Sequence, residues 1–388
     1  MTVRYIVETA YESVNKFGEE LCGDQIRLLA NEDKTRAVLS DGLGSGVKAN
    51  ILSSLTAEIS VRMLRENISI QEVIETILKT LPIDKTLNLA YATNTLIEID
   101  TISLKYRLYN FDNPPVLYFH NKKNAPLNCI QHQVMGYNLK VCEGTLSKGD
   151  VFIVMSDGLP HAGIGNVYNH SWDQDAIAAY IEDLFKYFPS DIKSIVQKTV
   201  THTRDLCADR PADDISMLGL YLRPKQATIV FTGPPSDPSE DAELVRRVLS
   251  FEGFRIVCGG TTSHLISAIN GRQITNNPRT MHKDVPPVGN LPGIDLLTEG
   301  ILTLSNVLEW LELSHGNPAV LPKDENAGLQ VARELLYSDE ITFLVGLAVN
   351  PIYQNPTLPQ SVSIRKNLVE KIAERLKQFG KIVHVEFH

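Results

Sequence analysis

Long hydrophobic runs are missing from this sequence. No stretch approaches the ~18 apolar residues that a membrane-spanning helix needs, and residues 1–16 carry charges throughout, unlike the apolar stretch of a signal peptide. We therefore expect a cytoplasmic protein that does not associate with a membrane.

The sequence also has few cysteines and no excess of positive charge. The five cysteines are widely spaced and form no Cys-x-x-Cys pair, which argues against a disulfide framework and against a zinc site. The formal net charge of -9 argues against a protein that binds the phosphate backbone of a nucleic acid. The remaining composition, 43% hydrophobic and 21% charged, is typical of a soluble globular protein.

The 388 residues are enough for two or three domains at roughly 150 residues each. The clearest boundary lies at residues 223–226, between one predicted strand at 214–222 and another at 227–231 that is followed by a turn-rich segment. We therefore predict two domains, residues 1–223 and residues 227–388.

The first domain mixes strands with long helices. In residues 45–65 apolar side chains recur at helical spacing, namely at Val47, Ile51, Leu55, Ile59 and Met63. A second helix follows and stops at Pro82, and after several strands two more amphipathic helices occupy 176–188 and 192–206. This order predicts an α+β fold in which helices flank two packed β-sheets, an α-β-β-α sandwich.

The second domain alternates strands and helices more regularly. Strands are expected at 227–231, 254–258, 294–297, 341–346 and 381–387, with helices between them. This alternation is typical of a three-layer α/β domain with a mainly parallel sheet. The polar, proline-rich segment 270–292 is expected to be a long loop.

Acidic residues stand at the ends of several predicted strands of the first domain. Asp24 precedes the strand 25–30, Asp41 follows 35–40, Asp157 follows 151–156, and the pair Asp213 and Asp214 precedes 215–222. Any one Ser-Asp-Gly sequence is usually only a turn. The ordered set is more specific, because strands of one sandwich can bring such ends together.

Clustered carboxylates select hard cations. Oxygen ligands of this kind prefer Mg²⁺ or Mn²⁺ to Zn²⁺, and two such ions close together can activate a water for an in-line attack on phosphorus. The glycines after Asp41 and Asp157 permit tight turns that bring a backbone carbonyl near an ion.

Residues 1–223 resemble the PPM, or PP2C-like, phosphatases, and are most similar to the bacterial stage II E sporulation (SpoIIE) type of serine phosphatase. The resemblance rests on the segments CGDQ, LSDGLGSG, ATNTLIEID, LYNFDNPPVLYF, VFIVMSDGL and ADDISMLGL. The middle segments match a non-catalytic family feature, a strand pair that closes on an Asn-Pro-Pro turn. The resemblance implies a metal-dependent protein serine/threonine phosphatase, a hydrolase that acts in signalling.

The family implies a role for each matching residue. Asp41 would bridge two or more Mn²⁺ or Mg²⁺ ions, and the carbonyl of Gly42 would bind one of them. Asp157 and Asp213 would hold the first ion, and Asp24 would help to hold the second, through water. Asp214 occupies a position where relatives have Asn or Asp, so it ranks below Asp213 as a metal ligand. The nucleophile would be a hydroxide that bridges the metals.

The sequence departs from some relatives after Asp41-Gly42. Eukaryotic members have a histidine there that is thought to act as a general acid, whereas this chain has Leu43. His161 could substitute, although a histidine in such a loop is more often solvated. Arg4 and Arg27 are weak candidates for binding phosphate, because a solvated or ion-paired arginine is the commoner case.

The resemblance also implies the partner. Relatives of this type act on phosphoserine in a small regulatory protein, an anti-anti-sigma-like STAS domain, and a homodimer is an open alternative for the assembly. A second interpretation is a regulatory binding module, in which the phosphatase fold is a scaffold and the C-terminal domain senses a ligand. A third makes the C-terminal domain an enzyme, but it lacks a recognisable nucleophile or base cluster.

One segment of the C-terminal domain could bind a ligand. Gly259, Gly260, Thr261, Thr262 and Ser263 follow the strand 254–258 and could open a helix. A glycine-rich turn at a helix N-terminus presents N–H groups to an anion, so a phosphate-bearing ligand is one interpretation. A simple turn with a Thr or Ser cap is the other. The loops at 233–239 and 298–300 are expected at the same edge of the sheet.

Overall fold

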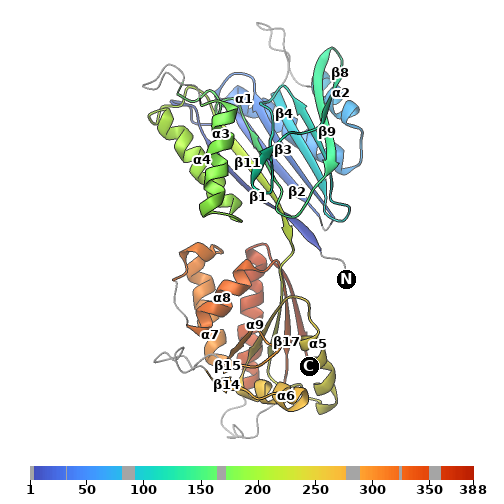
Figure 1. The fold of residues 1–388 in the computed structure, drawn as a ribbon, viewed down its shortest axis with the longest axis vertical. Helices are drawn as coiled ribbons and strands as arrows, with labels where there is room; N and C mark the ends of the chain where they lie inside the picture. The colour runs from blue at the N-terminus through green and yellow to red at the C-terminus, as the bar shows by residue number, and fades with distance from the viewer. Residues whose placement is uncertain are drawn as a thin grey trace. The chain divides into compact units, whose positions relative to one another are not determined.

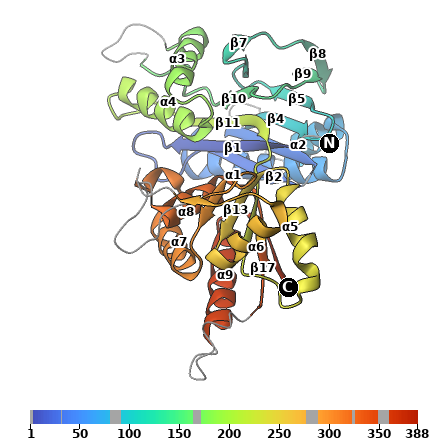
Figure 2. The same ribbon diagram turned by 60° about the horizontal axis from the view of Figure 1, so that its bottom comes forward.

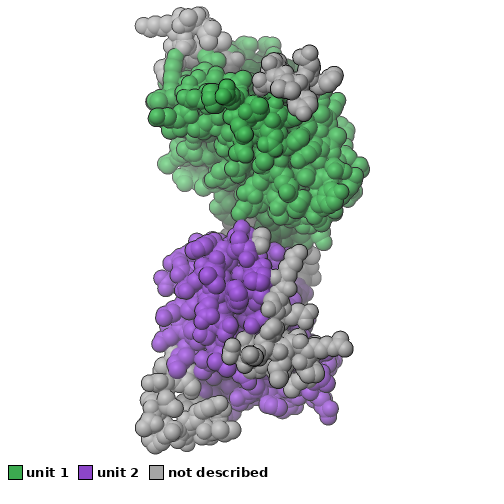
Figure 3. Space-filling model, turned by 90° about the vertical axis from the view of Figure 1, so that its left-hand side faces the viewer, with its two compact units in different colours: residues 1–224 green, residues 225–388 purple. Residues whose placement is uncertain are grey.

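The computed structural model describes residues 4–31, 33–80, 92–163, 172–276, 289–322, 326–348 and 360–388. The chain divides into two compact units, Met1–Pro224 and Lys225–His388 (Figure 3). None of the helices in the described residues is long and apolar enough to cross a membrane.

The first unit contains two antiparallel sheets packed face to face. The five-stranded sheet has the order β1 (Tyr5–Val14), β11 (Ile215–Pro224), β10 (Val151–Met155), β6 (Leu117–His120) and β7 (Lys123–Ala125). The six-stranded sheet has the order β2 (Asp24–Ala30), β3 (Lys34–Gly42), β4 (Ala92–Asp100), β5 (Lys105–Phe111), β9 (Tyr137–Thr145) and β8 (Cys129–Val134). Leu39 and Ile97 of one sheet pack against Phe152 and Leu218 of the other, so the core lies between them.

Helices cover the outer face of each sheet (Figures 1 and 2). α1 (Gly46–Arg65) and α2 (Ile70–Thr80) pack on the six-stranded sheet, while α3 (Gln174–Tyr187) and α4 (Ile192–Leu206) pack on the five-stranded sheet. The N-terminal unit is therefore an α-β-β-α sandwich, and the predicted fold class is confirmed.

The helix α1 forms where the apolar spacing predicts it, but a different face is buried. Val47, Ile51 and Leu55 are 62%, 52% and 46% exposed. The buried face consists largely of small residues such as Ala49, Ser53, Ala57 and Ser60. Small side chains let two backbones approach closely: an ideal Cβ on Gly42 of β3 would lie 2.0 Å from the carbonyl oxygen of Ala49.

The Asn-Pro-Pro segment differs from the expectation. It does not close a strand pair, because β5 pairs with β4 and β9 in one sheet while β6 pairs with β10 and β7 in the other. The segment crosses between the sheets, and the buried Asn113 holds it there by donating to the carbonyl of Leu39 (3.2 Å) and to Thr95 Oγ1 (3.2 Å). Local sequence cannot show this, since both arrangements need the same tight bend.

The cysteine spacing argues against a disulfide framework, but the first unit does contain one disulfide that the spacing did not predict. Cys129 of β8 and Cys142 of β9 are bonded. The antiparallel register places these two residues directly opposite each other, which the separation of 13 residues does not reveal. Cys22, Cys207 and Cys258 are free.

The second unit is a three-layer α/β domain, as predicted. Its parallel strands have the order β16 (Leu296–Thr298), β13 (Phe254–Cys258), β12 (Ala227–Thr232), β17 (Glu340–Val345) and β18 (Ile382–Phe387). The short β14 (Thr275–Asn276) and β15 (Gly289–Asn290) add an antiparallel edge within the predicted loop, whose residues 277–288 lie outside the described part.

Five helices form the two outer layers of this unit. α5 (Asp241–Leu249) and α6 (Gly260–Asn270) cover one face of the sheet. α7 (Ile301–Ser314), α8 (Ala327–Tyr337) and α9 (Gln360–Gln378) cover the other. The central strands β12, β13 and β17 therefore have both faces buried, which explains why they read as nearly continuous apolar runs. The edge strand β18 leaves Ile382 and Phe387 exposed.

Candidate metal centre

Two of the predicted ligands face each other on neighbouring strands. Asp24 is the first residue of β2, and Asp41 stands next to the end of β3. The antiparallel register pairs these two residues directly. Because paired residues of adjacent strands point to the same side of a sheet, both carboxylates project from the same corner of the sandwich.

The other sheet supplies the remaining aspartates. Asp157 follows β10 with Ser156 between them, and Asp213 and Asp214 precede β11. The two strands are held together at this end because Ser156 N donates to the carbonyl of Ser216 (3.0 Å) and Ser216 N donates to Ser156 Oγ (2.9 Å). Each sheet therefore brings its acidic residues to the edge where it meets the other.

These carboxylates, called here the aspartate cluster, lie near enough to repel one another. Burial, followed by repulsion from Asp24, Asp157 and Asp213, raises the pKa of Asp41 to about 9, and a hydrogen bond with Asp157 adds to the effect. Burial also raises the pKa of Asp24 to about 7, with Asp214 and Asp157 contributing. The pKa of Asp213 is raised as well, mainly by burial. Negative charge gathered in this way favours a cation.

Asp24 is the most exceptional member of the cluster. It is only 3% exposed, yet neither of its carboxylate oxygens has a hydrogen-bond partner among the described residues. The hydroxyls of Ser156 and Ser216 lie near enough to lower its pKa, but not in the geometry of a hydrogen bond. A buried carboxylate without partners is costly, so this group is suited to an ion or to an ion's water.

Two glycines allow the backbone to pass close to the cluster. The Cβ of any residue at 42 would collide with α1, as described above. An ideal Cβ on Gly158 would lie 2.1 Å from the carbonyl oxygen of Asp214. Both positions therefore require glycine, and both turns hold the adjacent aspartate, Asp41 or Asp157, in place.

Comparison with known proteins identifies the type of the first unit. Residues 31–223 match the family model described as Stage II sporulation protein E (SpoIIE). This part of the chain is a PP2C-like segment of the SpoIIE type. Stage II sporulation protein E of Bacillus subtilis (strain 168) is 25% identical over 240 residues, which cover 59% of this chain and 27% of that protein. The chain thus spans about a quarter of the length of that relative.

Two solved structures are similar at lower identity. The PP2C phosphatase domain of SpoIIE from Bacillus subtilis, solved with a fragment of its regulatory domain, has a TM-score of 0.47 and 22% identity, covering 57% of this chain and 64% of that one. The RsbU and RsbW domains of Rv1364c from Mycobacterium tuberculosis have a TM-score of 0.47 and 17% identity, covering 63% and 68%.

The aspartates of the SpoIIE-type segment have the chemistry of metal ligands, although their side chains do not yet surround a common point. Within the described residues, no three His, Cys, Asp or Glu side chains already surround one point. The unpartnered oxygens of Asp24 and the mutual repulsion of Asp41, Asp157 and Asp213 are nevertheless what a set of oxygen ligands shows when no cation balances it. The residues present therefore fit a hard divalent cation.

Asp214 has a different position from the other aspartates of the SpoIIE-type segment. Its two carboxylate oxygens accept hydrogen bonds from the backbone N–H groups of Lys16 (2.8 Å) and Gly23 (2.9 Å). The residue is 3% exposed. Asp214 therefore fastens the loop that leads into Asp24, and the sequence alone could not distinguish this role from ligation.

The two adjacent aspartates should respond differently to truncation. Asp214→Ala leaves one buried and one partly buried N–H group without an acceptor and should lower the free energy of unfolding by about 2–4 kcal/mol. Asp213→Ala removes one acceptor, for the backbone N–H of Asp214 (3.0 Å), but it also removes a repelled carboxylate, so the metal-free protein should lose much less stability. Urea unfolding followed by Trp172 fluorescence tests this in a Trp310→Phe background, because Trp172 and Trp310 are the chain's two tryptophans. Equal losses for both variants would contradict the assignment.

The other sequence candidates are exposed or already paired. Arg27 pairs with Glu58 (3.4 Å) and donates to Gln25 Oε1 (3.0 Å). Arg4 and His161 are exposed. Lys16, which sequence reasoning missed, is near enough for its positive charge to lower the pKa of Asp213. No local motif marks Lys16, because it reaches the cluster only through the loop that Asp214 holds.

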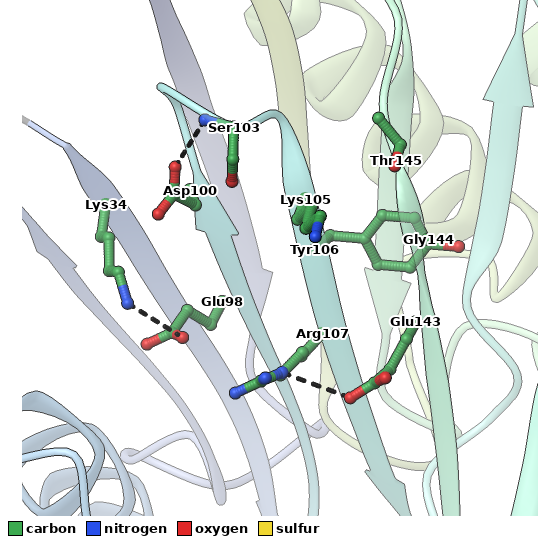
Figure 4. Close-up of a pocket in the computed structure, with 10 residues that line it drawn as sticks. All are labelled: Lys34, Glu98, Asp100, Ser103, Lys105, Tyr106, Arg107, Glu143, Gly144 and Thr145. Carbon is green, nitrogen blue, oxygen red and sulfur yellow. Dashed lines mark hydrogen bonds and ion pairs between the residues drawn. The ribbon is translucent and has the colours of Figure 1, made fainter.

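A hollow of about 440 Å³ lies at the opposite end of the six-stranded sheet (Figure 4). Its charges are paired with one another: Lys34 with Glu98 (3.6 Å) and Arg107 with Glu143 (3.2 Å). Asp100 accepts from the backbone N–H of Ser103 (2.7 Å). Since these charges neutralise each other at the surface, the hollow offers no chemistry comparable to that of the aspartate cluster.

Proposed function

We propose that the first unit is a metal-dependent protein phosphatase that hydrolyses phosphoserine or phosphothreonine. The observation that supports this most is that Asp24, Asp41, Asp157 and Asp213 lie at one edge. Both oxygens of the buried Asp24 lack a partner in the part of the chain that the structure describes. Because the chain spans only part of its curated relative, the activity of that protein is carried over here as a proposal.

Each residue has a proposed task. Asp41, which interacts with three other aspartates, would bridge two Mn²⁺ or Mg²⁺ ions, with the carbonyl of Gly42 beside it. Asp157 and Asp213 would complete one ion's ligands, and Asp24 would serve the other. When bound, such ions lower the pKa of a water and stabilise negative charge on a phosphoryl group. Asp214 would keep the Asp24 loop in position.

The proposed substrate is a folded or extended phosphoprotein rather than a small metabolite. The cluster lies at the surface edge of the sandwich, and Asp41, Asp157 and Asp213 remain partly exposed. The resemblance to SpoIIE-type phosphatases favours a phosphoserine in a small regulatory protein, of which a STAS domain is the proposed example.

Metal removal tests the proposal directly. We expect the full chain to hydrolyse a phosphoserine peptide with Mn²⁺ or Mg²⁺, to lose that activity after dialysis against EDTA, and to regain it when either ion is added back, because the carboxylates alone cannot neutralise the phosphoryl group. Release of inorganic phosphate is the measurement.

Two outcomes would contradict the proposal. Undiminished hydrolysis in EDTA would exclude the metal centre. A normally folded protein that binds neither ion in calorimetry and releases no phosphate would favour the alternative of a binding module. Asp183→Asn is the matched control, because Asp183 lies on the exposed surface of α3, where it pairs with Lys186. This variant should retain full activity.

A further inference from the structure

The parallel sheet of the second unit has a topological switch point, where the order in which strands are added changes sides. From the central β12 the chain moves outward through β13 to β16, then returns to the other side of β12 as β17 and continues to β18. In sheets of this kind ligands bind beyond the carboxyl ends of the strands near such a point. That edge consists here of the residues that follow Thr232, Cys258, Thr298 and Val345.

Two helices begin side by side at this edge. α6 has Gly259 as its N-cap and α7 has Gly300, and neither N-cap has a side chain that caps the helix. An ideal Cβ on Gly300 would lie 3.5 Å from the Cα of Gly259, so the two starts touch. The first N–H groups of a helix have no partner within it, and the two positive dipole ends add together.

The space in front of α6 is open. An ideal Cβ on Gly260 would meet no atom within 4 Å, and Thr261 is exposed in the same turn. Gly259 has a φ of +120°, a conformation that favours glycine. Gly233 N, at the end of β12, donates to Thr262 Oγ1 (2.8 Å), and this bond fixes the first turn of α6 against the central strand.

A buried hydroxyl without a partner among the described residues lies at the end of the central strand, one residue before Gly233. Thr232, Cys258 and Thr298 occupy paired positions at the ends of three neighbouring strands, so their side chains point to the same face of the sheet, the face that α7 covers. Thr298 Oγ1 donates to Cys258 Sγ (3.3 Å). Thr232 Oγ1 is fully buried and has no partner among the described residues, as is also true of Thr303 Oγ1 in the first turn of α7.

A cationic side chain reaches the same edge from α9. Arg365 Nη1 donates to the carbonyl of Gly346 (2.7 Å), next to Gly233. Burial lowers the pKa of this guanidinium, and no carboxylate pairs with it in the part of the chain that the structure describes. An arginine in this state gains from a nearby anion.

We propose that the second unit binds a small molecule with a phosphate group at this edge, where the first turns of α6 and α7 hold the phosphate. The N–H groups of Gly260 and Thr261 would donate to the phosphate oxygens, and the hydroxyl of Thr261 would add a further donor. Arg365 lies beside Gly233 at the central part of the edge, where the remainder of the ligand would lie. This site is independent of the aspartate cluster in the first unit.

One negative charge lies beside the proposed site. Glu299 Oε2 accepts from the backbone N–H of Gly300 (3.1 Å). Its carboxylate is exposed, so it can turn into solvent when an anion replaces it. The proposed site therefore uses N–H groups of α6 primarily, and α7 contributes after that exchange.

Calorimetry on the full chain in EDTA tests the site without interference from a metal centre. ADP and inorganic pyrophosphate are the probes, and adenosine is the control without phosphate. We expect ADP and pyrophosphate to bind, with adenosine at least about tenfold weaker. Hydrogen exchange should show slower exchange at residues 260–263 when ADP is present.

Charge variants locate the site on α6. Thr261→Glu places a carboxylate where the phosphate would bind and should weaken ADP binding by about tenfold or more. Ala268→Glu adds the same charge in the last turn of the same helix and should change affinity by less than about twofold. Arg365→Gln should also weaken ADP binding. This variant tests the carboxyl edge of the sheet without altering α6.

Several results would overturn the proposal. It fails if the wild-type chain binds neither ADP nor pyrophosphate, if adenosine binds as tightly as ADP, or if Thr261→Glu and Ala268→Glu behave alike. Thr261→Glu should fold normally because acidic residues stabilise a helix N-terminus, and unchanged circular dichroism would verify this. Slower exchange elsewhere than at α6 and α7 would likewise place the ligand in a different site.

Discussion

Asp41→Asn is expected to lower the hydrolysis of a phosphoserine peptide by roughly a thousandfold. The substitution keeps the shape of the side chain but removes the charge that Asp24, Asp157 and Asp213 repel and that a bridging cation would need. Because the register places residue 41 directly against Asp24, the loss should affect both proposed ions.

The measurement separates loss of chemistry from loss of folding. Initial rates at saturating Mn²⁺ are compared for the wild type, Asp41→Asn and the surface control Asp183→Asn, with circular dichroism for each. We expect a collapse of turnover for Asp41→Asn alone, with its fold intact. Turnover within a few-fold of the wild type would show that Asp41 is not at the reacting centre.

The metal-free first unit should lose stability as the pH rises from about 5 to 9. The folded pKa values of Asp24 and Asp41 are raised to about 7 and about 9, above the ordinary value near 3.8. A raised carboxyl pKa contributes stability that is fully present below the unfolded pKa and is lost as pH rises through the folded pKa. Ionising the two buried groups should cost on the order of several kcal/mol.

Comparison with Asp41→Asn isolates this effect from other titrations. Surface carboxylates such as Glu58, whose pKa an ion pair with Arg62 lowers, add stability as pH rises and are common to both proteins. We expect the wild type in EDTA to fall below Asp41→Asn by pH 8, when urea unfolding is followed by Trp172 in the Trp310→Phe background. Added Mn²⁺ should reverse the order, because the proposed metal centre would be complete only in the folded wild type. Parallel pH curves for the two proteins would contradict the clustering of charge at residue 41.

Local sequence was sufficient for features that depend on neighbours in the chain. The strand before Asp157 is a continuous apolar run, the glycines at 42 and 158 mark the turns, and the sequence of residues 258–263 predicts a strand end that opens a helix; the structure contains all of these. The two sheets with flanking helices also follow from the order of the elements, since each element has one apolar face to bury.

Other features depend on which strands become neighbours, and periodicity does not encode this. The disulfide between Cys129 and Cys142 is an example of a contact that register alone creates. The exposed face of α1 is another: Val47, Ile51 and Leu55 mark the helical period, yet the smaller residues pack inward because β3 approaches so closely. The role of Asp214 as an anchor for the loop before Asp24 arises in the same way.

The sequence by itself determined the kinds of elements, their order, and the chemical identity of the acidic residues at the strand ends. Only the tertiary structure decided that Asp24 is buried without partners, that Asp214 binds backbone N–H groups, and that two glycine-capped helices start beside each other at Gly259 and Gly300. The reason is physical: propensity and apolar spacing act over a few residues, whereas burial and repulsion depend on groups up to about 190 positions apart, which meet only when the sheets pack.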